Sequence, residues 1–134
     1  MDNLYYLIKI FGNPDALIDH WDTSSNRYAI WEFEETFSIN NKGEALLNGK
    51  LSHESPLELF QKTLDNWKSE SNELSAVGYI SYDFKNILFP HIAFSNPNST
   101  QPLLWFGKPK LVIPYRITES ELEKAFPVFL MKKD

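Results

Sequence analysis

The chain has 134 residues, of which 43% are hydrophobic and 15% aromatic, and its formal net charge is −5. A chain of this length and composition can bury a core, which excludes a disordered protein. The absence of cysteine excludes disulfides, thiolate metal sites and a cysteine nucleophile, and no basic cluster favours nucleic acid as a partner. Without a signal peptide or an apolar run of about 18 residues, we expect no membrane association and a soluble, cytoplasmic protein with a single domain, residues 1–134.

The N-terminal stretch is rich in residues that favour strands. Residues 4–11 (LYYLIKIF) are apolar almost throughout, which predicts a strand buried on both faces. Gly, Asn, Pro and Asp at 12–15 predict a turn, and a short apolar piece at 16–18 follows it. The polar residues 19–26 predict a loop.

A long alternating stretch comes next. Residues 27–39 (RYAIWEFEETFSI) alternate apolar and polar side chains, which predicts a strand with one solvated face. Glu35 interrupts the alternation, so we expect a bulge near it that returns Phe37 to the core. Residues 40–43 predict a turn, and residues 44–51 (EALLNGKL) are expected to return as its hairpin partner.

Residues 55–58 (SPLE) carry three signals for a helix start: a serine N-cap, proline at the first helical position, and glutamate in a capping box. The helix is expected to run to about residue 68. Its expected apolar stripe has helical spacing and consists of Leu57, Phe60, Leu64 and Trp67.

Residues 76–84 (AVGYISYDF) are apolar on both faces of an extended chain, which predicts a central strand. Asp83 is expected to cap a short helix that ends before Pro90, and Tyr79 and Tyr82 are expected to pack around the end of the strand. Residues 95–102 predict a polar linker.

The last third of the chain predicts one more strand and one more helix. Residues 103–115 have strand character, and Gly107 and Pro109 predict a bulge or an edge position there. A second capping box predicts a helix over 119–126, and the apolar residues 128–131 are either a terminal strand or the start of something longer. The element order predicts an α+β fold with a mainly antiparallel sheet.

The residues themselves show no catalytic constellation. Glu32 and Glu34 share a strand face and could act as an acid and base pair, although a solvated strand face that includes Glu35 explains them equally well. No glycine-rich phosphate loop is present, and we expect no metal site. The histidines stand alone in loop-like contexts: His20, His53 and His91.

Four segments, taken in order, carry a resemblance to a known family. They are residues 25–30 (SNRYAI), 55–58 (SPLE), 78–83 (GYISYD) and 101–106 (QPLLWF). In this order and spacing they resemble the N-terminal region of chorismate-utilising enzymes, namely component I of aminodeoxychorismate synthase and of anthranilate synthase. Ser81 stands where that family usually has glycine.

The resemblance implies half of an α/β/β/α sandwich, in which helices cover one face of a mainly antiparallel sheet. It also implies a non-catalytic N-terminal accessory domain, because the chorismate site and its magnesium ion belong to the family's C-terminal domain. The chain itself is then expected to hold no catalytic residue and no cofactor. The implied partners are that chorismate-binding catalytic domain and a glutamine amidotransferase.

The family's amino-acid pocket suggests His20, Arg27 and Tyr28 as ligand-binding positions, with His20 in place of the usual serine. Two alternatives to the accessory domain stay open. One is a stand-alone module that binds aromatic small molecules through Trp21, Trp31 and Trp105, and the other is a protein-interaction domain. Because a sheet built to face another sheet exposes apolar area, we also expect the chain alone to form a homo-oligomer.

Overall fold

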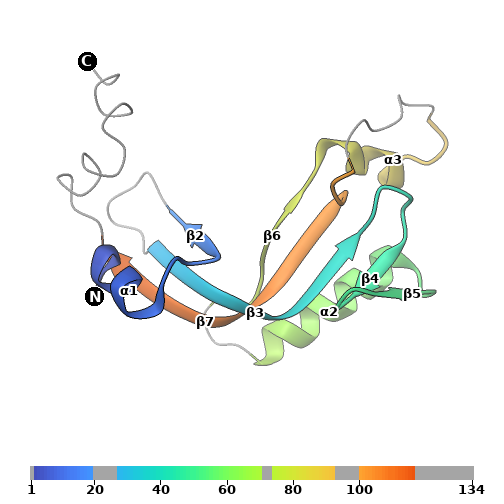
Figure 1. The fold of residues 1–134 in the computed structure, drawn as a ribbon. Helices are drawn as coiled ribbons and strands as arrows, with labels where there is room; N and C mark the ends of the chain where they lie inside the picture. The colour runs from blue at the N-terminus through green and yellow to red at the C-terminus, as the bar shows by residue number, and fades with distance from the viewer. Residues whose placement is uncertain (1, 20–26, 71–73, 93–99, 117–134) are drawn as a thin grey trace, which may run out of the picture. The chain divides into compact units, whose positions relative to one another are not determined.

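The computed structural model describes residues 2–19, 27–70, 74–92 and 100–116, which form an α+β fold with a mostly antiparallel sheet (Figure 1). The strands are β1 (Asp2–Asn3), β2 (Ala16–Ile18), β3 (Arg27–Ile39), β4 (Ala45–Leu47), β5 (Lys50–Ser52), β6 (Val77–Ile80) and β7 (Leu104–Arg116). The helices are α1 (Leu4–Phe11), α2 (Pro56–Glu70) and α3 (Lys85–Leu88), with a 3₁₀ turn, η1 (Tyr82–Phe84), before α3.

The described strands form one sheet in the order β1-β7-β3-β4-β5, with β2 paired to β3 and β6 paired to β7. Strand β1 is parallel to β7, whereas β2, β4 and β6 are antiparallel to their partners. The fold divides into two compact units. We call residues 1–32 with 111–134 the terminal unit and residues 33–110 the central unit, and β3 and β7 run through both.

The strand predicted at residues 4–11 is wrong, because this stretch is helix α1. Asn3 starts the helix: its side-chain oxygen accepts hydrogen bonds from the backbone N–H groups of Tyr5 at 2.8 Å and Tyr6 at 3.3 Å. Gly12 ends it with a φ of 82° and donates its N–H to the Ile8 carbonyl. A run that is apolar except for Lys9 hides the helical period, so the polar cap decides the structure.

The core of the terminal unit lies between α1, β3 and β7. Its buried residues are Leu4, Leu7, Ala29, Trp31 and Tyr115. The indole N–H of Trp31 donates to the Gly12 carbonyl at 3.0 Å, and the Phe11 ring lies 5.3 Å from the Trp31 ring. Buried tryptophan therefore anchors the end of the helix to the strand.

Two hairpins follow β3 in the central unit, where one was predicted. The turn at 40–43 is confirmed: Gly43 has a φ of 81° and donates to the Asn40 carbonyl at 3.0 Å. Residues 44–51 are not one strand, because Asn48 (φ 53°) and Gly49 (φ 79°) turn the chain between β4 and β5. Positive φ at both positions is typical of a type I′ turn, which the Asn-Gly pair favours.

Helix α2 confirms the predicted start at Pro56, and the Ser55 carbonyl accepts the Leu59 N–H at 2.9 Å. The predicted stripe is wrong in one place, since Leu57 is exposed and Leu59 is buried instead. Helix α2 packs on β3, β4 and β7 through a cluster that includes Phe37, Ile39, Ala45, Leu59, Trp67, Phe84, Leu103 and Leu104. Phe60 adds a stacked ring 5.3 Å from Phe37.

Strand β6 is not the central strand predicted, because among the described strands it pairs with β7 alone and most of its residues are exposed. Asp83 does not cap α3 either. Phe84 holds that N-cap position, while Asp83 lies in η1 with its carboxylate 3.8 Å from the Lys85 ammonium. Tyr82 does not pack around the strand end, since 84% of its surface is exposed.

Strand β7 continues from Leu104 to Arg116 through Gly107 and Pro109. The pairing with β6 ends at Gly107 and that with β1 begins at Tyr115, so Pro109 lies where that side of β7 carries no described strand. This agrees with the predicted edge position.

Several predicted segments lie outside the described residues. They are the loop at 20–26, most of the linker at 95–102, the helix at 119–126 and the apolar residues 128–131. No helix in the described ranges is long and apolar enough to span a membrane.

Candidate functional site

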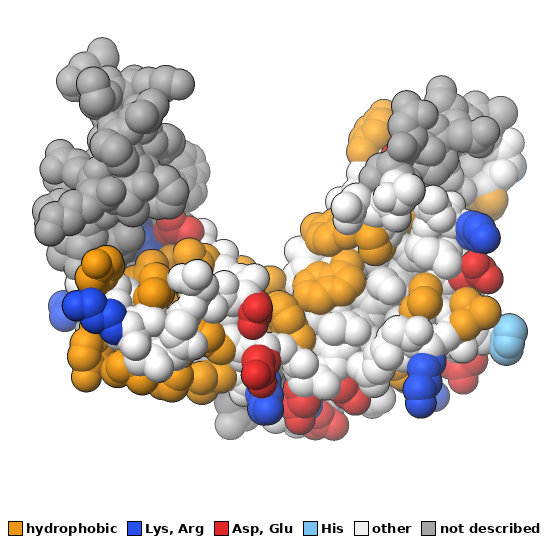
Figure 2. Space-filling model, viewed as in Figure 1, with side chains coloured by type: hydrophobic (Ala, Val, Ile, Leu, Met, Phe, Trp, Pro, Cys, Tyr) orange, Lys and Arg blue, Asp and Glu red, His pale blue; other side chains and the backbone are white. Residues whose placement is uncertain are grey.

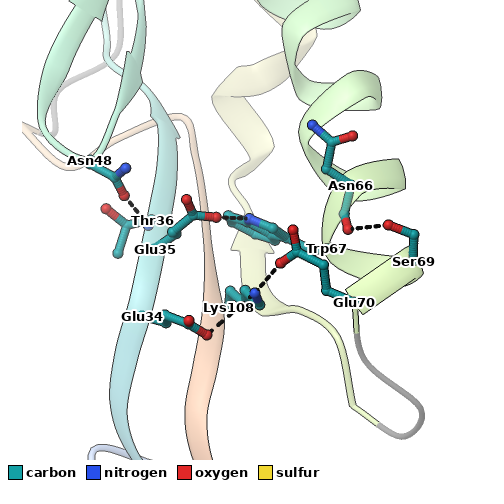
Figure 3. Close-up of polar contacts among 9 residues, drawn as sticks. All are labelled: Glu34, Glu35, Thr36, Asn48, Asn66, Trp67, Ser69, Glu70 and Lys108. Carbon is teal, nitrogen blue, oxygen red and sulfur yellow. Dashed lines mark hydrogen bonds and ion pairs between the residues drawn. The ribbon is translucent and has the colours of Figure 1, made fainter.

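A cluster of polar side chains joins β3, β7 and α2 in the central unit. Figure 3 shows Glu35 of β3 directed at Trp67 of α2, and Lys108 of β7 between Glu34 and Glu70. The sequence pattern indicates only the glutamates of β3. The partners Lys108 and Glu70 come from elements far apart in the chain, and no local pattern marks them.

Lys108 is the charged centre of this cluster, and its side chain is only 11% exposed. Its ammonium lies 3.3 Å from Glu34 Oε2 and forms a closer ion pair with Glu70. The hydrogen bond to Glu70 raises the pKa of Lys108 above its ordinary value, burial opposes that shift, and Glu34 adds to it. Because the two carboxylates keep the ammonium charged, this group is suited to holding strand and helix together.

Glu35 makes the second contact of the cluster. Its Oε2 accepts the indole N–H of Trp67 at 2.6 Å, and Trp67 is almost fully buried. This bond explains why the polar side chain of Glu35 can lie on the face that packs against α2. The sequence predicts a bulge near this residue. Glu32 has a positive φ of 64° and donates its N–H to Asp15 Oδ2 at 2.7 Å.

The proposed acid and base pair therefore gains no support from the geometry. Glu34 is bound to Lys108, and Glu35 to Trp67. Glu32 is exposed and lies in the other unit. The arrangement of Glu34 and Glu35 accounts for both as structural groups.

The second notable feature of the central unit is a row of aromatic rings on β3, β7 and β6. The rings of Phe33 and Trp105 meet edge to face at 5.1 Å, and those of Trp105 and Tyr79 lie 6.5 Å apart. Leu104 and Phe106 pack with the α2 cluster, so alternation places Trp105 on the other side of the sheet. We call Phe33, Trp105 and Tyr79 the aromatic row.

Apolar side chains remain exposed beside this row. Figure 2 shows hydrophobic side chains gathered over β6 and the adjoining part of β7. We call the exposed residues of β6, η1 and the α3 region the β6–α3 surface, and they are Tyr79, Ile80, Tyr82, Leu88, Phe89 and Ile92. The Lys85 ammonium covers one side of the Tyr82 ring at 3.7 Å. Exposed apolar side chains that gather on one unit in this way are typical of an interaction site.

The three predicted ligand-binding positions are only partly described. His20 lies outside the described residues. Arg27 forms an ion pair with Asp19, and Tyr28 is half-buried opposite Ile18 of β2. Since Arg27 and Tyr28 are neighbours in one strand, their side chains leave it on opposite faces, so the strand does not bring these two together.

The tryptophans proposed to bind a planar ligand have different environments. Trp31 is buried in the terminal unit, Trp105 belongs to the aromatic row, and Trp21 is not described. His53 and His91 are both exposed. Within the described ranges, no group of three or more His, Asp or Glu side chains is placed to hold a metal ion.

A shallow depression of about 370 Å³ lies at the start of α2, lined by Glu54, Ser55, Glu58, Leu59 and Lys62. Its walls combine acidic and basic side chains without a buried polar group.

Comparisons with known protein families, curated proteins and solved structures find no match to this chain.

Proposed function

We propose that the chain is a non-catalytic accessory domain of an aminodeoxychorismate synthase component I-like protein, which supports chorismate amination by packing against the catalytic domain. The observation that carries the proposal is the β6–α3 surface with the adjoining aromatic row. Trp105 is half-buried and Tyr79 is 42% exposed, so the row can accept a further layer of side chains. Aromatic residues are enriched in the centre of protein interfaces.

The sequence motif of the resemblance lies in the same place. Residues 78–83 (GYISYD) form β6 and the start of η1, and they supply Tyr79, Ile80 and Tyr82 to the β6–α3 surface. A role for this motif in binding a partner would explain why its tyrosines are not in the core. In this proposal magnesium, chorismate and the ammonia delivered by a glutamine amidotransferase all belong to the partner proteins.

The test uses the chain with a separately produced catalytic domain of a component I synthase. We expect the chain to bind that domain and to raise its turnover of chorismate with ammonia and magnesium. Tyr82→Ser and Leu88→Ser should weaken binding, because both residues are exposed on the β6–α3 surface. Tyr5→Ser is the matched control, since Tyr5 is an exposed aromatic residue on α1 of the terminal unit.

Two results would contradict the proposal. Turnover of chorismate by the chain alone would show that it is catalytic. Equal binding by the Tyr82→Ser, Leu88→Ser and Tyr5→Ser variants would show that the β6–α3 surface is not the contact. Calorimetry with tryptophan and related aromatic acids tests the alternative of a small-molecule module, for which a saturable titration is expected.

A further inference from the structure

Strand β6 lies at an edge of the described sheet, and its hydrogen bonds to β7 indicate which of its backbone groups face outward. The Ser81 N–H donates to the Leu103 carbonyl at 2.8 Å, in register with the β6 and β7 pairing. Backbone groups of an antiparallel strand face its two neighbours alternately. Tyr79 therefore bonds toward β7, whereas Gly78 and Ile80 direct their N–H and C=O groups to the outer edge.

This edge carries neither the charges nor the proline that protect many edge strands from pairing. Such strands usually carry charged residues, proline or a bulge, or are very short. Strand β6 (VGYI) has neither charge nor proline, and Gly78, Tyr79 and Ile80 are exposed. The edge strand β5 differs, because it has only three residues and begins with Lys50. An added extended strand would satisfy the outward backbone groups of β6.

We propose that β6 pairs with β6 of a second copy of this chain, antiparallel and across a two-fold axis at Tyr79. In this register Gly78 faces Ile80 of the second copy, and Ile80 faces Gly78 of the second copy. Both are hydrogen-bonded pairs, and each exchanges two N–H···O bonds between outward-facing groups. A two-fold axis requires such a self-complementary surface.

The side chains fit the same register. Gly78 adds no side chain on the face where Ile80 of the second copy lies, and the position of its missing Cβ is filled by the Trp105 carbonyl and Phe106 of its own chain. On the other face Tyr79 meets Tyr79 of the second copy in the closer, non-hydrogen-bonded type of pair, which favours aromatic contacts. The strand brings no like charges together, because its nearest charged described neighbour, Asp83, lies beyond its end. This self-complementarity is the reason for choosing a second copy as the occupant.

Sedimentation of the full chain from about 5 to about 500 μM tests the pairing, because this range covers micromolar dissociation constants. We expect a reversible dimer that Ile80→Lys weakens at least about 100-fold, since lysine is a typical edge-protecting residue. Leu51→Lys on β5 is the matched control, because Leu51 is 50% exposed and Ile80 is 55% exposed. Far-ultraviolet circular dichroism should show that both variants keep the wild-type fold.

A monomeric wild type over the whole range would overturn the proposal. So would a dimer or larger assembly that Ile80→Lys leaves intact, or that Leu51→Lys disrupts as strongly. No catalytic domain takes part in this experiment, so its failure leaves the proposed function standing, and the reverse also holds.

Cross-linking tests the register itself. The chain contains no cysteine, so a single introduced thiol is unambiguous. Facing residues of a non-hydrogen-bonded pair have Cα atoms about 4.5 Å apart, a separation that a disulfide can bridge. Tyr79→Cys should form a covalent dimer under mild oxidation, and adding Ile80→Lys should suppress it. Leu51→Cys is the control, and cross-linking of Leu51→Cys as fast as that of Tyr79→Cys would refute the register.

Discussion

The hydrogen bond between Glu35 and Trp67 should be a major stabilising contact of the central unit. Glu35→Ala removes the acceptor and leaves the nearly buried indole N–H of Trp67 unpaired, which costs about 1–3 kcal/mol. Trp67→Phe removes the donor and also leaves space in the α2 cluster, so its cost should exceed that of Glu35→Ala. Glu35→Gln keeps an oxygen acceptor and should lose about 1 kcal/mol or less.

The double variant separates the bond from the loss of packing. If the contact is a hydrogen bond to a charged acceptor, the coupling energy from the four proteins should be about 1.5–3 kcal/mol. Urea unfolding followed by far-ultraviolet circular dichroism gives each free energy of unfolding. The matched control is Gln61 with Asp65, an exposed bonded pair at 3.0 Å on the same helix, where Asp65→Ala should change stability by less than about 0.5 kcal/mol. A coupling energy within about 0.3 kcal/mol of zero would refute the role given to Glu35.

Three further predictions concern single positions. Gly107→Ala should destabilise the chain by about 1–3 kcal/mol, because its Cβ would lie 2.5 Å from the Phe33 ring, and Phe33→Leu in the same chain should recover part of that loss in urea unfolding. Ser81→Ala should raise the free energy of unfolding by about 1 kcal/mol, since the buried Ser81 hydroxyl has no hydrogen-bond partner among the described residues, and an unchanged urea midpoint would contradict this. Burial raises the pKa of Tyr115 above 10.0, and the charge of Asp19 adds to this shift. The unfolded state therefore releases this proton at a lower pH than the folded state does, so the free energy of unfolding should fall as the pH rises above 10.0. Tyr115→Phe should reduce that alkaline loss without abolishing it, because the raised pKa of Lys108 acts in the same direction, and an identical pH profile would contradict the assignment.

Local signals predicted those elements whose start or turn is determined by a few adjacent residues. The SPLE segment gave the start of α2, and the turn at 40–43 gave the first hairpin. The Asn48 and Gly49 turn is equally readable, because Asn-Gly is a strong hairpin signal, although the apolar residues on both sides of it favour one continuous strand. Helix α1 was missed because its eight residues, all apolar except Lys9, fit a strand as well as a helix, and only the Asn3 cap distinguishes the two.

The position of a strand in its sheet is not a local property, and this limited the prediction of the candidate site. The apolar residues of β6 fit a central strand, yet their exposure depends on which strands lie beside them. Lys108 is likewise remote in sequence from Glu34 and Glu70, so only the fold brings the three together. The aromatic row could have been inferred in part, because Trp105 alternates with Leu104 and Phe106, but the pairing with Tyr79 requires the register.

The buried indoles of Trp31 and Trp67 give each unit an optical reporter of its own. Trp31 donates to a backbone carbonyl in the terminal unit, and Trp67 donates to a carboxylate in the central unit. A chain that keeps one of these two indoles, with the other and both Trp21 and Trp105 replaced by phenylalanine, should report on one unit alone during denaturation. If one unit opens at lower denaturant than the other, the two midpoints will differ, and the chain will unfold as two cooperative blocks joined by shared strands.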